Sequence, residues 1–457
     1  MIVMKFGGTS VQDATAIDRV AQIVQGRLAD RPLVVVSAMA KVTDSLLAMG
    51  KAAGGGDRKT ALKMARALRE RHYETAGELL GTALFTEFHG DLGADFEDLD
   101  ELLRGIGAVG EITPRTFDNV AAFGEMLSSK IVAAAFVARG LPGVHVDSRQ
   151  CLLTDSAFMR AVPQFDETNE RLQKRVKPLL DAGKVPVMGG FIGCNRAGIT
   201  TTIGRGGSDF SAAIFGAGLD AGRIEIWTDV DGMMTTDPRL CPDARRIKVI
   251  SFDEAAELAY FGAKVLHPAT VLPAIQKNIP VFVLNSHNPT CEGTKITARA
   301  PHSSNVFKAI ALKKKITIID VAAPRRLLVH GYLKSIFEAF DHHNVAVDVV
   351  STSEVSVSIT AETNEAIPAL AADLAKLADV KYEGRKAIVC LVGESLRDTP
   401  GVAAKVFGLL EGVKIRMISQ GASEINLTFV IEEDDAAEVV RRLHKEFYAE
   451  ADPEVFA

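Results

Sequence analysis

The chain has 457 residues, of which 47% are hydrophobic and 24% are charged, and its formal net charge is -6. This profile is typical of an ordinary globular protein of about two to four domains, with a core large enough to need no disulfide staples. The negative charge gives no support to a nucleic-acid or anionic-membrane partner, so an anionic ligand would need positive groups gathered locally.

The five cysteines are spread singly and form no Cys-x-x-Cys pair, which favours reduced thiols and a cytoplasmic protein. The chain opens with MIVMKFGG, which lacks a charged-then-apolar leader, so no signal peptide is expected. No run of about 18 apolar residues occurs, so no membrane span is expected.

The first two-thirds of the chain alternates short apolar runs with amphipathic stretches. This pattern predicts an α/β fold in which a mostly parallel sheet is covered by helices on both faces. The predicted strands are Ile2–Phe6, Leu33–Ser37, Val144–Asp147, Val185–Met188, Arg223–Thr228 and Val281–Leu284. The predicted helices include Ala16–Leu28, Asn119–Arg139 and Glu167–Ala182.

Residues 50–112 are rich in Ala, Leu, Arg and Glu and contain no convincing strand, so they predict a helical excursion. The Gly54–Gly56 run within it is interpreted as a turn and not as a phosphate loop, because no strand precedes it.

The first chemical motif is Lys5–Ser10, KFGGTS, at the end of the first strand. Glycines at this point let backbone N–H groups approach phosphate oxygens, and a helix that follows points its N-terminus at the same oxygens. Lys5 supplies a point charge for phosphates. A structural Gly-Gly turn is the alternative, and the motif is neither a GxGxxG nor a Walker A sequence.

A second motif, Thr200–Asp209, places glycines, an arginine and an acid beside a predicted helix at Ser208–Gly216. Helix capping explains Ser208 or Asp209, but it does not explain Arg205 between two glycines. The guanidinium group of Arg205 is suited to bind a carboxylate through two parallel hydrogen bonds.

Two further motifs follow. Trp227–Arg239 reads WTDVDGMMTTDPR and follows a strand, at the sheet edge where α/β proteins bind ligands. A polar loop is the alternative. Phe261–Pro268 reads FGAKVLHP and places Lys264 in an otherwise apolar segment, where a solvated lysine is the alternative.

The composition changes after a plausible linker at Ala300–Asn305, and the remainder is an internal repeat. Gly331–Phe337 aligns without gaps with Gly401–Phe407, 70 residues later, and Ser353–Val357 aligns with Ser423–Leu427. Each unit reads as strand, loop, helix, strand, strand and helix. A repeat of this length favours two small domains that pair their sheets.

These motifs, in this order, resemble the aspartokinase family: KFGGTS, GRGGSD at 204–209, TDVDG at 228–232, TTDPR at 235–239 and FGAKVLHP. The resemblance covers nearly the whole chain. KFGG is shared across the wider amino-acid kinase family, whereas the combination is specific to aspartokinases. The tail resembles tandem ACT domains, which are ferredoxin-like α+β modules. The whole resembles the monofunctional form, without a dehydrogenase domain, and most of all its lysine-sensitive class.

The resemblance implies a catalytic domain at residues 1–298 and two ACT domains at 312–382 and 383–457. It also implies transfer of the γ-phosphoryl group of ATP to the side-chain carboxylate of L-aspartate, the first step of lysine, threonine and methionine biosynthesis. Lys5 and the Gly7-Gly8 backbone would hold the transferring phosphate, and Asp209 would orient Lys5. Thr43, Glu125, Arg205 and Ser208 would hold aspartate, with Glu125 on its α-ammonium and Arg205 on its α-carboxylate.

For ATP, the resemblance implies contacts in addition to Lys5 at Gly7, Gly8, Thr9, Thr228, Asp229, Met234, Arg239, Lys264 and Val265. No dedicated protein cage for Mg²⁺ is visible, so the metal is expected to ride mainly on the phosphates. A carboxylate is already a competent nucleophile, so no general base is required, and cations and backbone amides stabilise the loose transition state.

For the tail, the resemblance implies an amino-acid effector, with lysine favoured, at paired ACT units, and homodimers with tetramers as the alternative. The candidate effector contacts are Gly331, Tyr332, Leu333, Val347, Asp348, Ser353 and Glu354. Asp348 or Glu354 would pair with the effector's ammonium. Arg325 and Arg326 occupy a stretch that is usually uncharged in lysine-sensitive relatives, which leaves threonine open. A purely structural dimerisation module is the alternative.

Two other functions compete with this reading. One is another kinase of the same fold, acting on glutamate, carbamate or a nucleoside monophosphate, although such kinases typically lack FGAKVLHP and the tandem repeat. The other is a non-catalytic amino-acid sensor, against which Lys5, Arg205 and Asp209 argue.

Overall fold

The computed structural model describes residues 1–204, 206–262, 268–322 and 331–457. The chain forms two compact units. The first unit contains Met1–Met233, Val249–Phe252 and Val265–Ala300, and the second contains Met234–Lys248, Asp253–Lys264 and Pro301–Ala457.

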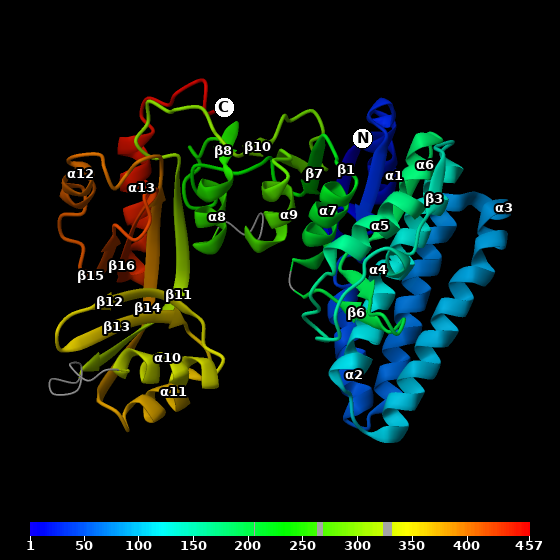
Figure 1. The fold of residues 1–457 in the computed structure, drawn as a ribbon, viewed down its shortest axis with the longest axis horizontal. Helices are drawn as coiled ribbons and strands as arrows, with labels where there is room; N and C mark the ends of the chain where they lie inside the picture. Colours follow the sequence, from blue (N-terminus) through cyan, green and yellow to red (C-terminus); the bar gives the residue numbers. More distant parts are fainter. Residues whose placement is uncertain (205, 263–267, 323–330) are drawn as a thin grey trace. The chain divides into compact units, whose positions relative to one another are not determined.

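The first unit is built on an eight-stranded sheet in the order β3-β4-β2-β1-β7-β9-β10-β8 (Figure 1). The strands from β3 to β9 pair in parallel, and β10 pairs antiparallel with β9. All six predicted strands are confirmed to within two residues at each end. The sheet strands are β1 Ile2–Phe6, β2 Pro32–Val36, β3 Gly143–His145, β4 Val185–Gly189, β7 Arg223–Thr228, β8 Val249–Ser251, β9 Val281–Asn285 and β10 Thr294–Thr297.

The central strands are buried along their whole length because helices cover both faces of the sheet. A separate antiparallel pair, β5 and β6, lies after β4. The remaining elements of this unit are α1 Ala14–Gln25, α2 Val42–Gly54, α3 Arg58–Val109, α4 Pro114–Ala138, α5 Phe165–Arg175, α6 Lys177–Asp181, α7 Gly207–Gly218, α9 Leu272–Gln276, β5 Ile192–Cys194 and β6 Thr200–Thr202, with short 3₁₀ turns at Gly8–Val11, Leu28–Asp30, Ser148–Gln150 and Pro268–Val271.

The predicted helical excursion is confirmed as α2 and α3, which lie beside α4 in the ribbon (Figure 1). Gly55 and Gly56 form the turn between α2 and α3, as predicted, and Gly56 has a φ of 85°. α3 is interrupted at Gly81, whose φ of 64° and ψ of 168° are not helical, so two helices meet at a kink there.

The helix α4 is the core helix of this unit. It begins at Pro114, preceded by the N-cap Thr113, whose hydroxyl accepts a hydrogen bond from the Thr116 N–H. Its length and apolar composition would suffice to cross a bilayer, yet 78% of that stretch is buried inside the protein. Its hydropathy is therefore explained by packing against the sheet.

The second unit confirms the internal repeat. One antiparallel sheet runs in the order β12-β13-β11-β14-β16-β15, so the two repeats pair through β11 and β14 (Figure 1). The first repeat contains β11 Ala309–Ala322, α10 Tyr332–His342, β12 Val347–Thr352, β13 Ser356–Glu362 and α11 Ile367–Leu374. The second contains β14 Asp379–Val392, α12 Val402–Gly408, β15 Ile415–Gln420, β16 Asn426–Glu432, a 3₁₀ turn at Glu433–Asp435 and α13 Ala436–Phe447.

Two segments from the middle of the chain pack with the second unit. In Met234–Lys248, the Thr235 carbonyl accepts a hydrogen bond from the Ile310 N–H at 2.7 Å. In the helix α8, Phe252–Tyr260, Glu254 forms a buried ion pair with Lys308, with an N–O distance of 3.0 Å. Breaking a buried pair leaves an uncompensated charge, so this contact holds α8 firmly on the second unit.

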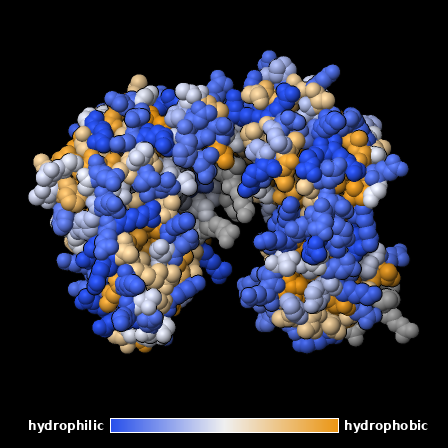
Figure 2. All heavy atoms as spheres, turned by 180° about the vertical axis from the view of Figure 1, so that it is seen from behind, coloured by the Kyte–Doolittle hydropathy of each residue, from blue (hydrophilic) through white to orange (hydrophobic). Residues whose placement is uncertain are grey.

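The surface of each unit is mainly hydrophilic, with apolar side chains scattered among polar ones (Figure 2). Exposed apolar residues include Leu333 and Phe337 on α10, which are 43% and 39% exposed.

Candidate active site

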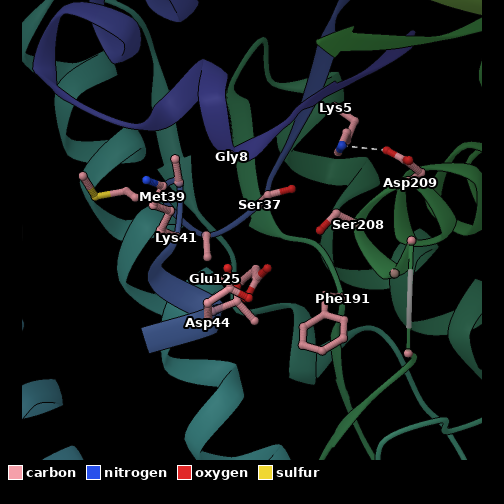
Figure 3. Close-up of a pocket in the computed structure, with 16 residues that line it drawn as sticks. Lys5, Gly8, Ser37, Met39, Lys41, Asp44, Glu125, Phe191, Ser208 and Asp209 are labelled. Atoms are coloured by element: carbon pink, nitrogen blue, oxygen red, sulfur yellow. Dashed lines mark ion pairs between the residues drawn. The ribbon is translucent and has the colours of Figure 1, made fainter. Parts of the chain in front are cut away.

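A pocket of about 390 Å³ opens in the first unit, beside the carboxyl ends of β1, β2 and β4 (Figure 3). Parallel α/β sheets bind ligands at this edge. The pocket brings together six residues that the sequence nominated: Lys5, Gly8, Thr43, Glu125, Ser208 and Asp209. It is also lined by Ser37, Ala38, Met39, Ala40, Lys41, Asp44, Phe191, Gly204, Gly206 and Gly207.

One side of the pocket carries an ion pair. The Lys5 Nζ lies 2.6 Å from the Asp209 Oδ1, and the two side chains are 11% and 15% exposed (Figure 3). Lys5 is the penultimate residue of the fully buried strand β1, and Asp209 lies in the first turn of α7, so two rigid elements fix the pair. Partial burial strengthens the field of the Lys5 ammonium, because little water is present to screen it.

The glycine turn after β1 is required by a close backbone approach. A Cβ on Gly8 would lie 2.9 Å from the Ala38 carbonyl oxygen, and the Ala40 N–H donates to the Gly8 carbonyl oxygen at 3.1 Å. Any larger residue at position 8 would push the β1 turn away from the β2 turn. The α7 N-terminus, which begins after Gly206, borders the same pocket. Its free N–H groups favour an anion there.

Glu125 is the buried acid of the pocket, at 4% exposure, and comes from α4 (Figure 3). Burial raises the pKa of its carboxyl to about 8, although the Ala38 backbone N–H acts in the opposite direction. Its Oε2 is buried and has no hydrogen-bond partner among the described residues. A buried acceptor without a donor is costly, so this oxygen is prepared to receive a ligand donor.

The opposite wall depends on the Gly189-Gly190-Phe191 turn after β4. A Cβ on Gly190 would lie 2.6 Å from the Ser208 Cα, and a Cβ on Gly189 would lie 2.9 Å from the Glu125 carbonyl oxygen. The two glycines therefore let α4 and the start of α7 close around one space. The Phe191 ring lines that space (Figure 3).

Sequence reasoning missed several lining residues, among them Ser37, Lys41, Asp44 and Phe191. A usable signal was present for Phe191, because a Gly-Gly pair at the carboxyl end of a buried strand repeats the arrangement of the first motif. The signal for Lys41 is structural, since its φ of 67° sets the entry into α2.

Asp118 ties the walls of the pocket together from behind. This buried α4 residue, two helical turns before Glu125, accepts hydrogen bonds from the Met159 N–H at 3.0 Å, the Thr202 N–H at 2.9 Å and the Thr202 hydroxyl at 2.7 Å. Thr202 ends β6, directly before the loop that leads to Ser208. Asp118 thus fixes the end of β6 relative to Glu125.

We expect Asp118→Asn to raise the KM for the small carboxylate substrate by about 10-fold, because one amide N–H would face an N–H donor and shift the loop. The KM for the nucleotide should change less than about 2-fold, since the nominated nucleotide contacts Lys5 and Gly8 lie on β1 and the turn after it, whereas Asp118 bonds Met159 and Thr202. Steady-state kinetics with each substrate varied in turn measures both values. Equal losses for both substrates would contradict this role.

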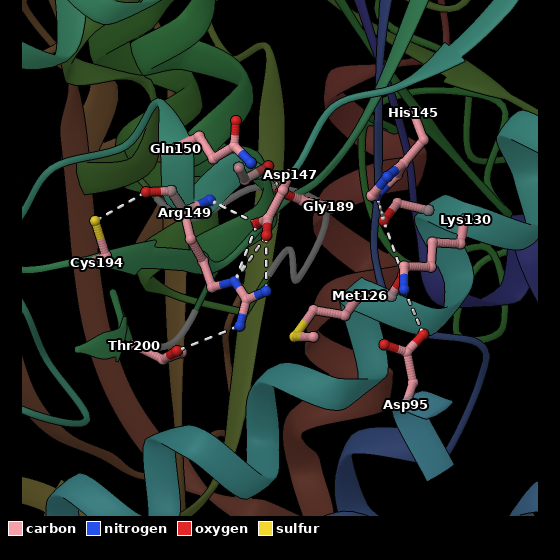
Figure 4. A network of polar contacts seen from close by, with 12 residues as sticks. Asp95, Met126, Lys130, His145, Asp147, Arg149, Gln150, Gly189, Cys194 and Thr200 are labelled. Carbon is pink, nitrogen blue, oxygen red and sulfur yellow. Dashed lines mark hydrogen bonds and ion pairs between the residues drawn. The ribbon is translucent and has the colours of Figure 1, made fainter. Parts of the chain in front are cut away.

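The matched control for that variant is Asp95→Asn. Asp95 on α3 pairs with Lys130 on α4, with 2.6 Å between the two side chains (Figure 4). It therefore supports the same helix as Asp118 does, but through a contact with α3. Its loss should lower the thermal midpoint and leave both KM values unchanged. The same view shows Arg149 held by Asp147, with an N–O distance of 2.7 Å, and reaching the Thr200 hydroxyl at 3.5 Å, which braces the start of β6.

The other nominated nucleotide contacts that the structure describes do not line this pocket. Thr9 lies in the 3₁₀ turn after β1, and Thr228 and Asp229 lie at the end of β7 in the first unit. Met234 and Arg239 belong to the second unit, where Arg239 is paired with Asp237 at 2.6 Å. Arg205, Lys264 and Val265 lie outside the described residues, as do Arg325 and Arg326.

The nominated effector residues all lie in the first repeat of the second unit. Gly331, with a φ of 89°, caps α10 ahead of Tyr332 and Leu333. Val347 and Asp348 lie on β12, and Ser353 and Glu354 form the turn between β12 and β13. Asp348 is ion-paired with Lys313, a partner that sequence reasoning did not identify.

Family models and curated relatives match nearly the whole chain. Residues 1–285 match the model of the amino acid kinase family, and residues 389–447 match an ACT domain model. The chain is 37% identical to the lysine-sensitive aspartokinase 3 of Escherichia coli, over 98% of this chain and 99% of the relative. It is also 37% identical to the chloroplastic aspartokinase 2 of Arabidopsis thaliana, over 99% of this chain and 85% of the relative.

Two solved structures of one Escherichia coli enzyme are similar to this chain over nearly its whole length. Escherichia coli aspartokinase III in complex with aspartate and ADP, in its R-state, is similar with a TM-score of 0.84 and 36% identity, over 98% of this chain and all of that chain. The same enzyme with lysine and aspartate, in its T-state, gives a TM-score of 0.85, over 98% of this chain and 99% of that chain.

Proposed function

The chain belongs to the aspartokinase family, and from that premise we propose how its residues transfer the γ-phosphoryl group of ATP to the side-chain carboxylate of L-aspartate. The product is 4-phospho-L-aspartate, at the start of lysine, threonine and methionine biosynthesis. The observation that carries the assignment of roles is the pocket itself, which places a lysine ammonium on one side and a buried carboxylate on the other (Figure 3).

The chemistry needs charge stabilisation and little else. Aspartate's side-chain carboxylate is already ionised at neutral pH, so it attacks the γ-phosphorus without a general base. Lys5 neutralises the oxygens of the transferring group, and Asp209 holds the Lys5 ammonium at 2.6 Å in the required position. The Gly8 backbone and the α7 N-terminus add N–H donors to the same oxygens. The Gly7 N–H, which the sequence also nominated, instead donates to the Trp227 carbonyl oxygen at 3.1 Å.

Glu125 receives aspartate's α-ammonium on its unpartnered Oε2, which distinguishes an amino acid from a simple dicarboxylate. Thr43 and Ser208 line the same pocket and would also contact aspartate. Arg205, from the loop before α7, takes the α-carboxylate.

We expect Arg205→Ala to raise the KM for aspartate by about 100-fold while the KM for ATP stays within about 2-fold, because a bidentate charge-assisted contact is lost for one substrate alone. Initial rates with each substrate varied in turn measure this. Comparable losses for both would contradict the assignment.

ATP would contact further nominated residues, which are Thr9, Thr228, Asp229, Met234, Arg239, Lys264 and Val265. Mg²⁺ would accompany the nucleotide. Mg²⁺ dehydrates reluctantly and commonly binds through substrate phosphates and water, so we expect it to bind mainly to the phosphates of ATP.

The second unit, as two ACT domains at 312–382 and 383–457 beside a catalytic domain at 1–298, would bind a regulatory amino acid. L-Lysine is favoured, because the similar Escherichia coli enzyme is named lysine-sensitive and its structure contains lysine. The exposed Leu333 and Phe337 on α10 suit homodimers formed through this region, with pairing into tetramers as a further step. A cytoplasmic location accords with five free cysteines.

Trapping the product with hydroxylamine tests the reaction directly. An acyl phosphate reacts with hydroxylamine to give a hydroxamate, so incubation with Mg-ATP and L-aspartate should yield aspartyl hydroxamate. L-Glutamate, whose side chain is one methylene longer, is the control and should yield far less product. As much hydroxamate from glutamate as from aspartate, or none from aspartate, would contradict the proposed substrate.

A further inference from the structure

The Asp348 carboxylate on β12 is buried and only half satisfied. Its side chain is 3% exposed, and its Oδ1 lies 2.7 Å from the Lys313 Nζ. Its Oδ2 is buried without a hydrogen-bond partner among the described residues. An ionised carboxylate offers about four acceptor positions, so this group has room for a further ammonium donor.

Lys313 is not held as firmly as its partner. Its side chain is 23% exposed, and its Nζ lies 5.7 Å from the centre of the Tyr260 ring. Lys313 also lies where the pairing of β11 with β14 shifts register, between Lys313 and Ile316. A long, flexible side chain at an irregular point of a strand can leave its partner without disrupting the sheet.

Tyr260 links this pair to α8. Its hydroxyl donates to the Val347 carbonyl oxygen at 3.0 Å, one residue before Asp348. Burial and, after it, the charge of the Asp348 carboxylate raise the pKa of the Tyr260 phenol. The end of α8 is therefore tied to β12 beside the half-satisfied carboxylate.

The same end of α8 touches β11 through Gly262. A Cβ on Gly262 would lie 2.5 Å from the Leu312 carbonyl oxygen, so β11 approaches the chain there as closely as only glycine allows. Leu312 thus approaches Gly262, and the neighbouring Lys313 contacts both Asp348 and the Tyr260 ring. In sequence, that segment leads directly into Lys264, the residue nominated for the phosphates of ATP.

We propose that Lys313 is an internal substitute for the effector's ammonium: in the effector-free chain it occupies Asp348, and an effector carrying a primary ammonium displaces it. The displaced Lys313 leaves the Tyr260 ring, so effector binding changes the contacts of the last residue of α8. This inference rests on the proposed regulation by an amino acid and specifies its mechanism. One ammonium replaces another, so the buried charge stays balanced throughout.

Two substitutions of Lys313 test the exchange because they act in opposite directions. In Lys313→Gln the internal competitor is gone, so L-lysine should bind about 5–30-fold more tightly. In Lys313→Arg a guanidinium forks onto Asp348 more firmly, so L-lysine should bind several-fold more weakly. Isothermal titration of the full chain with L-lysine measures both affinities. The matched control is Lys315→Gln, an exposed lysine on the same strand, which should bind as wild type does.

The link to α8 is tested by Tyr260→Phe, which keeps the ring and removes the hydroxyl that donates to Val347. L-Lysine should bind it with near wild-type affinity yet inhibit ADP release less completely, while the uninhibited rate is unchanged. Asp348→Asn should lose most L-lysine binding. Circular dichroism on each variant verifies that it is folded.

Outcomes that overturn the inference differ from those that overturn the function. If wild type releases ADP with aspartate and binds L-lysine, but Lys313→Gln binds no more tightly than wild type or Lys313→Arg no more weakly, the exchange is wrong and the kinase assignment stands. If wild type binds no L-lysine, the proposed regulation and this exchange both fail. If aspartate supports no ADP release, the catalytic assignment fails on its own measurement.

Discussion

Lys5→Ala should lower kcat for aspartate-dependent ADP release by about 10²–10³-fold, the loss expected when one preorganised donor to a developing charge is removed. The Lys5 ammonium is the one described lysine of the pocket that is held by an acid, with 2.6 Å between its Nζ and the Asp209 Oδ1. Its loss also leaves the Asp209 carboxylate unpaired beside the anionic γ-phosphate, so the variant loses an attraction and gains a repulsion. Initial rates at saturating ATP and aspartate measure the change.

The matched control is Lys130→Ala. Lys130 forms an equally short pair with Asp95, at 2.6 Å, and is not among the residues that line the pocket (Figure 4). The Lys130→Ala substitution should lower thermal stability, because it leaves the Asp95 carboxylate without its partner. It should keep kcat within about 3-fold, because it removes no catalytic contact. If both variants lost activity equally, the Lys5 effect would be structural. A Lys5→Ala enzyme with near wild-type kcat would contradict the catalytic role outright.

Glu125→Gln should raise the KM for aspartate by about 100-fold with a much smaller change for ATP, because a buried charge-assisted contact to an ammonium is worth about 3 kcal/mol. The Gln side chain has nearly the same size, so the pocket keeps its shape. It presents a neutral amide to the substrate ammonium where the native chain presents a carboxylate. Titration with aspartate, with and without an ATP analogue, measures binding apart from turnover.

The pKa of Glu125 gives this prediction a pH signature. Burial raises that pKa to about 8. Below this pH the free enzyme carries a protonated Glu125, which must lose its proton before it can pair with an ammonium. The KM for aspartate should therefore fall as pH rises toward about 8, by up to about 10-fold per pH unit.

The Glu125→Gln variant should lose that slope. The linkage to stability has the opposite sign from that of a salt-bridged acid: the folded state holds the proton more tightly, so Glu125 costs stability as pH rises from its unfolded value of 4.5 toward about 8. The substitution should remove that cost. A wild-type KM independent of pH across this window would show that Glu125 is not the ammonium partner.

The sequence anticipated those parts of the fold that short-range patterns determine. The buried strands that end at Phe6 and Thr228 were predicted with correct bounds, because parallel strands covered on both faces form continuous apolar runs. The repeat was predicted because Gly331–Phe337 aligns with Gly401–Phe407. In the structure Gly331 and Gly401 cap equivalent helices, each with a positive φ. The kink at Gly81 was not predicted, since a single glycine within a helical pattern is usually tolerated.

The association of α8 with the second unit depends on contacts between residues distant in sequence. Glu254 and Lys308 are separated by more than fifty positions, and neither one alone signals a buried pair. Asp118 and Lys313 were missed for the same reason: each resembles an ordinary charged residue until its tertiary partners are known. The nominated site residues came from motifs whose chemistry is local, such as the glycines beside Lys5 and Asp209.

The most direct test of the account is ADP release from Mg-ATP with L-aspartate, measured with and without L-lysine. We expect turnover that requires aspartate and that lysine suppresses. Turnover that lysine leaves unchanged would retain the kinase and contradict the proposed effector. No turnover with aspartate would contradict the central claim that this pocket binds aspartate for phosphoryl transfer.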